Sequence, residues 1–202
     1  MATARAHSGS TQAAIRELFD ASVHAKLVFL NENAAALEQA IDLVVEAVAA
    51  GRKVLLFGNG GSAADAQHIA AEFVGRFRTE RKALAAIALT TDTSALTAIA
   101  NDYGFDEVFA RLVRALGARG DVAIALSTSG RSPNVLKAVA ACREIGVKTV
   151  GLTGGDGGTL AGMVDVSLRV SASTRSDRIQ ETHILIGHVI CELTDRRLFG
   201  ES

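Results

Sequence analysis

Short apolar runs that alternate with helical patterns are the feature that most constrains the fold of this chain. Each run is continuous, which is typical of a strand buried on both faces. Strands of this kind, mostly separated by helices, form a parallel sheet with helices on both sides. The sequence therefore predicts an α/β fold, a three-layer sandwich around a five-stranded parallel sheet. The predicted strands are KVLLFG (53–58), LAAIALT (84–90), DVAIALST (121–128), TVGLTG (149–154) and VSLRV (166–170).

Helical patterns lie at both ends of the chain. Two helical stretches, 11–30 and 33–51, precede the first strand, and Gly51 is the predicted stop of the second. The last helix, predicted over 177–197, carries apolar residues on more than one side. A helix of that kind is buried in a core or in a subunit interface.

The composition fits one globular domain without a membrane or nucleic-acid partner. The chain has 202 residues, of which 49% are hydrophobic and 21% charged, and its net charge is −1. That length suffices for one α/β core, and the charge indicates no polyanionic partner. No apolar run reaches the ~18 residues of a membrane span, and residues 1–12 lack the apolar segment of a secretory signal. We expect a cytoplasmic protein with a disordered tail over 1–10, a single domain over 11–202, and Cys142 and Cys191 as buried thiols.

Three of the predicted strands end in loops that are rich in glycine or hydroxyl groups. These loops are GNGGS (58–62), STSGRS (127–132) and TGGDGG (153–158). Ligands bind beyond the carboxyl ends of parallel strands, where glycine lets the backbone approach an anion and a helix N-terminus adds N–H donors. The second loop predicts a cradle for a phosphate monoester, and its four hydroxyls belong to Ser127, Thr128, Ser129 and Ser132.

Each of the first two loops has an alternative interpretation. The STSGRS loop fits a generic turn with Ser132 as the N-cap of the next helix. The GNGGS loop matches the dinucleotide pattern G-x-G-x-x-A over 58–63, which is typical of nucleotide cofactor sites. That pattern needs an acidic residue about 20 positions further on, whereas Asp92 lies more than 30 positions away. The sequence therefore favours a phosphorylated small molecule over a dinucleotide.

Two segments contain side chains suited to proton transfer or metal binding. His68 and Glu72 are four residues apart, so they share one face of the helix that starts at the GNGGS loop. His188 lies in an apolar part of the last helix. The alternatives are a solvated surface pair for His68 and Glu72 and a core histidine for His188. Their concentration in two segments, one of them directly after a phosphate loop, favours a site.

Four motifs in order resemble the phosphoheptose isomerases, a family of sugar isomerase (SIS) domain enzymes. The motifs are GNGGSAADAQHIAAEF (58–73), IANDYGF (99–105), GDVAIALSTSG (120–130) and RIQETHILIGH (178–188). The resemblance extends from about Leu18 to Phe199 and implies a SIS-type, flavodoxin-like fold with N-terminal helices. It implies an aldose–ketose isomerase that converts D-sedoheptulose 7-phosphate to D-glycero-D-manno-heptose 7-phosphate. It also implies a homotetramer with active sites at subunit interfaces, one zinc ion per subunit, and a role in making activated heptose for lipopolysaccharide or another surface glycan.

The resemblance assigns roles residue by residue. Glu72 corresponds to the catalytic base and His188 to its partner acid/base. The implied zinc ligands are His68, Glu72, Gln180 and His188. The implied substrate contacts are Asn59, Gly60, Gly61, Ser62, Arg76, Asn101, Asp102, Ser127, Thr128, Ser129, Ser132, Asp177 and Gln180.

Two questions stay open at the level of sequence. A non-catalytic branch of similar proteins binds the replication initiator protein or senses sugar phosphates, but it lacks the acid/base pair, so Glu72 and His188 favour an enzyme. Gln180 and His188 are separated by about 12 Å along a continuous helix, which is too far for easy binding of one metal. Either Gln180 precedes the helix proper, or a second subunit contributes to the site.

Overall fold

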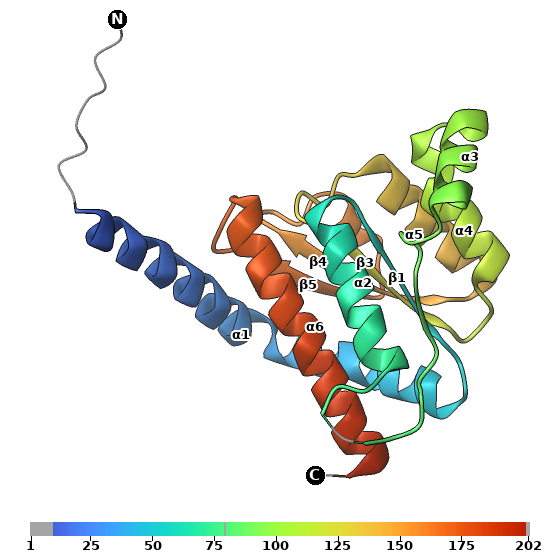
Figure 1. Ribbon diagram of the computed structural model, residues 1–202, viewed down its shortest axis with the longest axis horizontal. Coiled ribbons are helices and arrows are strands. Elements are labelled where there is room, and N and C mark those ends of the chain that lie inside the picture. Colours follow the sequence, from blue (N-terminus) through green and yellow to red (C-terminus); the bar gives the residue numbers. More distant parts are fainter. Residues whose placement is uncertain (1–9, 79, 201–202) are drawn as a thin grey trace, which may run out of the picture.

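The computed structural model describes residues 10–78 and 80–200 and contains one five-stranded parallel sheet. Its strands are β1 (Val54–Gly58), β2 (Ala86–Ala88), β3 (Val122–Ser127), β4 (Lys148–Gly154) and β5 (Val166–Val170). They lie in the order β2-β1-β3-β4-β5, with every neighbouring pair parallel. The predicted α/β class and the predicted strands are confirmed (Figure 1).

Helices cover both faces of the sheet, as the continuous apolar strands require (Figure 1). One layer consists of α1 (Thr11–Ala49), α2 (Gly61–Val74) and α6 (Ser176–Phe199), and the other of α3 (Thr93–Tyr103), α4 (Val108–Leu116) and α5 (Pro133–Ile145). Short 3₁₀ turns lie at Phe105–Glu107 and Leu160–Gly162. Side chains of β1 alternate between the two cores: Leu56 packs with the first layer, and Leu55 and Phe57 with the second.

The expectation of two N-terminal helices is wrong, because α1 is one continuous helix from Thr11 to Ala49. Asn33, the first residue of the second predicted stretch, falls inside it. The Asn33 amide donates to the carbonyl of Phe29 (3.0 Å), one turn earlier. The same amide donates to the Arg169 carbonyl and accepts from the Arg169 N–H, each at 3.2 Å. Asn33 therefore satisfies the free backbone edge of β5 without interrupting the helix.

The first half of α1 extends beyond the sheet layers (Figure 1). Ser10 caps this helix by accepting a hydrogen bond from the Ala13 N–H, and the remainder of the tail predicted to be disordered, residues 1–9, lies outside the described residues. Apolar side chains along this half are exposed, including Phe19 (70%) and Leu27 (56%). The second half packs against α6 and β5 and contributes Leu37, Ile41 and Val44 to the core. Within the described part of the chain, no helix has the length and apolarity needed to cross a membrane.

Candidate active site

The three glycine- and hydroxyl-rich loops meet at one edge of the sheet. β1, β3 and β4 are neighbours, with Gly58 beside Leu126 and Ser127 beside Thr153. Parallel neighbours end at the same edge, so the loops after these strands lie together, as predicted. The loop after β1 leads into α2 and the loop after β3 leads into α5, so two helix N-termini open at this edge.

Two hydroxyl groups of the loop after β3 face each other, and neither serves as a helix cap. The Oγ atoms of Ser127 and Ser132 are 3.1 Å apart, and Ser127 is buried. Ser132 is the N-cap residue of α5, yet its side chain makes no capping hydrogen bond. The generic N-cap alternative therefore does not describe how the Ser132 hydroxyl is used. The Ser129 hydroxyl accepts from the Arg131 N–H at 3.2 Å, so the predicted cradle of four hydroxyls stays a prediction.

Two asparagines join the loop after β1 to the start of α5. The Asn59 amide donates to Asn134 Oδ1, and the Asn134 amide donates to Asn59 Oδ1, both at 2.9 Å. Asn134 is buried, and its Oδ1 also accepts from the Val135 N–H. Asn59, a predicted substrate contact, thus fixes the loop after β1 relative to the loop after β3. Asn134 was missed in the sequence, since nothing local distinguishes it from an ordinary first-turn residue.

Glycine contacts fix the second wall of the cradle. Gly130 and Gly158 both have positive φ, at 63° and 55°. A Cβ on Gly130 would lie 2.0 Å from the Gly157 carbonyl oxygen, and one on Gly158 would lie 2.5 Å from the Ser129 carbonyl oxygen. The loops after β3 and β4 therefore pack backbone against backbone. A cavity of about 400 Å³ opens beside them, lined by Thr128, Ser129, Arg131, Gly154, Gly155, Asp156, Thr174 and Ile179.

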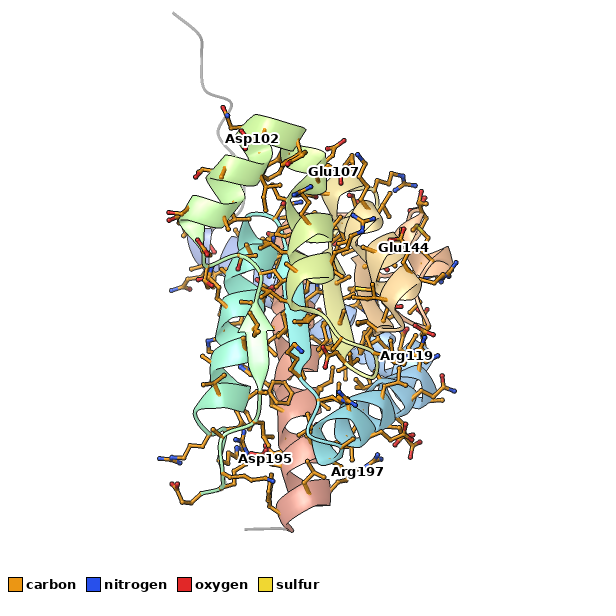
Figure 2. All side chains as sticks on the ribbon, turned by 90° about the vertical axis from the view of Figure 1, so that its right-hand side faces the viewer. Asp102, Glu107, Arg119, Glu144, Asp195 and Arg197 are labelled. Carbon is orange, nitrogen blue, oxygen red and sulfur yellow. The ribbon has the colours of Figure 1, made fainter. Side chains whose placement is uncertain are left out.

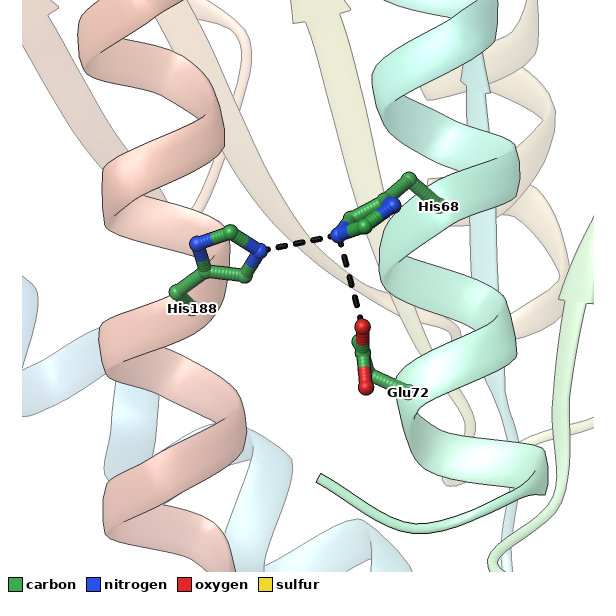
Figure 3. Close-up of side chains that lie close together, drawn as sticks. All are labelled: His68, Glu72 and His188. Atoms are coloured by element: carbon green, nitrogen blue, oxygen red, sulfur yellow. Dashed lines mark hydrogen bonds and ion pairs between the residues drawn. The ribbon is translucent and has the colours of Figure 1, made fainter. Parts of the chain in front are cut away.

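The predicted acid/base residues converge from two helices (Figure 3). His68 Nε2 lies 3.3 Å from Glu72 Oε1 and 2.9 Å from His188 Nε2. One ligand atom from each of the three residues lies within 4.8 Å of the others. The His188 ring also stacks on Phe77, with ring centroids 5.5 Å apart. His188 is only half-buried and meets His68, so the core-histidine alternative is wrong, whereas His68 and Glu72 do form the partly exposed pair of the other alternative, with His188 added to it.

The three side chains fit a divalent transition metal by donor type. Two imidazole nitrogens and one carboxylate oxygen are common zinc ligands, and catalytic zinc sites use three protein ligands with one position left open. The side chains of His68 and Glu72 are 51% and 23% exposed, so water or a substrate oxygen can reach this cluster.

Gln180 lies against the first turn of α2, eight residues before His188 on α6. It lies inside α6, so the alternative in which it precedes the helix is wrong. Its amide lies against the first residue of α2, since a Cβ on Gly61 would be 2.5 Å from Gln180 Nε2. Further along the same helix pair, a Cβ on Gly187 would be 2.3 Å from Ile69 Cδ1. Glycines on both helices bring α2 and α6 close, with Gln180 at the phosphate-loop end and His188 further along.

Four other predicted contacts lie outside both groups in this structure. Asn101 and Asp102 are exposed on α3, where the Asn101 amide donates to Asp102 Oδ1 (2.8 Å), and Asp102 lies at the outer end of the molecule (Figure 2). Arg76 lies after α2 and pairs with Glu80 at 3.5 Å. Asp177 lies at the start of α6 and pairs with Arg175 at 2.8 Å.

A buried ion pair behind the cluster was missed in the sequence. Arg81 Nε donates to Asp195 Oδ1 at 2.6 Å, and the two side chains are 1% and 4% exposed. The guanidinium also donates to the carbonyls of Glu72 and Phe73, each at 2.9 Å, in the last turn of α2. Arg81 thus satisfies the open carbonyl end of α2 and connects it to α6. The pair spans 114 residues of sequence, so no local pattern predicts it.

Asp65 is a second group that was not singled out in the sequence. It precedes His68 by one turn of α2 and lies between Gly61 and Ile69, two residues that contact α6. Its Oδ2 atom is buried without a hydrogen-bond partner among the described residues. Burial raises the pKa of this carboxyl group, and the charge of nearby His68 opposes that shift. The helix that carries Glu72 therefore presents a further carboxyl group at the α2–α6 contact.

A buried histidine links α6 to the end of β4 and predicts a pH effect on stability. His183 is fully buried with Nε2 3.1 Å from the Thr153 carbonyl oxygen, and burial lowers its pKa from 6.5 to about 4. In the unfolded chain His183 therefore binds a proton below about pH 6.5, whereas in the folded chain it binds one only below about pH 4. The contribution of His183 to stability is complete above pH 6.5 and is lost as pH falls to 4, by at most about 3 kcal/mol.

The His183→Gln variant tests this effect, because its amide can still donate to the Thr153 carbonyl but does not titrate. Urea unfolding of both proteins between pH 7 and pH 4 is the measurement. We expect the stability of the unmodified protein to fall more steeply with acidification than that of the variant. Parallel curves would assign the acid sensitivity to other groups.

The fold and the loops define a sugar isomerase domain. The SIS domain family model matches residues 18–154. The chain is 55% identical over 161 residues to the phosphoheptose isomerase of Geotalea daltonii, covering 80% of this chain and 83% of that one. It is 55% identical over 182 residues to the phosphoheptose isomerase of Roseiflexus sp., covering 90% and 92%. The solved phosphoheptose isomerase of Neisseria gonorrhoeae superposes with a TM-score of 0.86 at 48% identity, covering 92% and 99%. The chain belongs to the phosphoheptose isomerase family of SIS-domain proteins.

Proposed function

We propose that the protein is an aldose–ketose isomerase that converts D-sedoheptulose 7-phosphate to D-glycero-D-manno-heptose 7-phosphate. The observation that carries this proposal is that α2 joins a phosphate loop at its N-terminus to an acid/base cluster on its later turns. The family relationship supports the same reaction. The product would enter the synthesis of nucleotide-activated heptose, a lipopolysaccharide precursor. The proposed enzyme is a single domain over 11–202 that acts in the cytoplasm, where the buried thiols of Cys142 and Cys191 stay reduced.

The proposed mechanism moves one proton between neighbouring carbons. The Glu72 carboxylate takes a proton from C1 of the ketose to form a cis-enediol and returns a proton to C2 of the aldose. The imidazole of His188 exchanges protons with the oxygens on C1 and C2. The cradle of Ser127, Thr128, Ser129 and Ser132 holds the 7-phosphate and thereby orients the reacting carbons.

The direct test is conversion of sedoheptulose 7-phosphate by the purified protein, followed by a coupled assay for the aldose product. The unphosphorylated heptulose is the matched control, and we expect it to be a very poor substrate. Binding of sugar phosphate without turnover would overturn the proposal and indicate a regulator or sensor of the non-catalytic type.

The proposed enzyme holds one zinc ion per subunit at His68, Glu72 and His188, with Gln180 as the fourth ligand that the family resemblance implies. When bound, the ion would polarise the substrate carbonyl or orient the ligands. Glu72 and His188 act on substrate only when they are free of the ion, so the two roles compete.

Metal removal is expected to lower activity or thermal stability. Elemental analysis of untreated protein, followed by chelation and by re-addition of zinc, is the measurement. Full activity in protein that contains no zinc or other transition metal would contradict the metal site.

The proposed assembly is a homotetramer with active sites at subunit interfaces. Its support is the exposed apolar half of α1, which includes Phe19 and Leu27, and the separation of Gln180 from His188 along α6. A second subunit would cover the exposed apolar side chains of α1. It would also allow Gln180 and His188 of different subunits to meet at one site. Light scattering on a sizing column tests this, and a monomer at working concentration would contradict it.

A further inference from the structure

One charged side chain of the phosphate cavity has no role in the mechanism above. Arg131 lies between Ser129 and Ser132 in the loop after β3, and its guanidinium bends back over that loop. Nη1 donates to the Ser129 carbonyl at 3.0 Å, and Nη2 donates to Asp156 Oδ2 at 2.5 Å on the loop after β4. Both residues line the cavity together with Thr128 and Ser129. The two side chains are 57% and 68% exposed, so both are free to rearrange.

The charges of this cavity are unbalanced with respect to a phosphate. Arg131 is the only cationic residue among those lining it, and Asp156 is the only anionic one. The remaining groups are hydroxyls and backbone, which solvate a dianion without neutralising it, and one apolar side chain. Arginine binds phosphate through paired, charge-assisted hydrogen bonds. As the structure stands, Asp156 occupies the guanidinium edge that a phosphate would use.

The relative strengths of the two interactions favour an exchange. An exposed ion pair changes an equilibrium by at most about fivefold. A hydrogen bond between a charged donor and a charged acceptor changes it by about tenfold to a hundredfold. A phosphate bound beside Thr128 and Ser129 therefore competes successfully with Asp156 for Arg131.

We propose that Arg131 is a phosphate-binding residue of the substrate site, and that Asp156 holds its guanidinium at the edge of the cavity and releases it when a phosphate monoester binds. This inference rests on the proposed function, because that function places a sugar phosphate in the cavity. It adds a charge partner to the hydroxyl cradle and makes Asp156 a competitor of the substrate. The two residues therefore have opposite effects on phosphate binding, although they are partners in one ion pair.

That opposition defines the test. Arg131→Gln is expected to weaken the binding of inorganic phosphate by about tenfold to a hundredfold. Asp156→Asn is expected to tighten it, by at most about fivefold, because the asparagine oxygen still accepts from the Gly158 N–H (3.0 Å in the present structure) but no longer holds the cation. Arg131→Lys keeps the charge without the paired donors. Its affinity for phosphate should lie between that of Arg131→Gln and that of the unmodified protein.

The measurement is the dissociation constant of inorganic phosphate by calorimetry, with KM for the sugar phosphate as a second readout. The matched control is Arg114→Gln, which breaks another exposed ion pair, with Glu144, on α4 and α5. Weaker phosphate binding in both the Arg131→Gln and the Asp156→Asn variant would show that the ion pair only stabilises the loops, and it would overturn the proposal. Phosphate dissociation constants that are unchanged in both variants would overturn it as well. Phosphate binding is independent of turnover, so a protein that binds phosphate as expected but fails to isomerise heptulose would refute the proposed reaction and leave this inference standing.

Discussion

Replacement of Glu72 by glutamine is expected to lower kcat by about 10²–10⁴-fold while fold, thermal stability and subunit association stay intact. An amide keeps the size of the side chain but cannot accept a proton from carbon. Glu72 is on the last turn of α2, 23% exposed, with its carboxylate directed at His68, so the substitution disturbs no core contact. The effect should be on kcat rather than KM, because the phosphate loops are unchanged.

The measurement is kcat and KM for the sugar phosphate in matched preparations of both proteins. Glu144→Gln, an exposed carboxylate on α5, is the control and should keep full activity. Zinc content is determined in both proteins, since the variant also changes a candidate ligand. A variant with normal metal content and activity within tenfold of the unmodified protein would exclude Glu72 as the base.

The largest expected effect on stability follows from Arg81→Met, which should lower the free energy of unfolding by about 3–5 kcal/mol. This change leaves the buried Asp195 carboxylate without its partner and the carbonyls of Glu72 and Phe73 without a donor. Figure 2 shows Asp195 on α6 near the end of the helix, beyond the sheet. Loss of the Arg81 hydrogen bonds also loosens the last turn of α2, which carries Glu72. Activity should therefore fall at temperatures where the protein is still folded.

Denaturant unfolding with the variants measured in parallel provides the comparison. Arg114→Met removes an exposed arginine of similar size and should change stability by less than about 0.5 kcal/mol. The double variant Arg81→Met/Asp195→Leu removes the unpaired charge and should recover part of the loss. A single Arg81 variant as stable as the Arg114 control would mean that the pair contributes no stability.

The sequence predicted what depends on local pattern and missed what depends on distant partners. Continuous apolar runs sufficed for the strands, because only a doubly covered parallel sheet buries both faces. The pairing of His68 with Glu72 followed from helical spacing alone. The continuity of α1 was missed, and the partner of Asn33 within it is the edge of β5, 136 residues away in sequence. The ion pair between Arg81 and Asp195 was not predicted either, because its two residues are 114 positions apart in the sequence.

Gln180 shows the same limit in the candidate site. Its helical distance from His188 predicts that one subunit cannot easily bring both to one metal, but its neighbour was not predictable. That neighbour is Gly61, and the contact exists because a glycine there lets two helices approach. Residue types and spacing identify candidates, whereas their distances depend on packing between elements.

The glycine contact between the loops after β3 and β4 has a consequence for binding energetics. Gly130 and Gly158 let the two loops pack backbone against backbone within the fold itself. The conformational entropy of the cradle is therefore lost during folding, and little remains to be lost when a phosphate arrives. A preorganised anion site leaves most of the intrinsic binding energy of the phosphate available to orient the far end of the ligand. A side chain at either glycine would separate the loops and return that entropy cost to the binding step, which makes two residues without functional groups determinants of affinity.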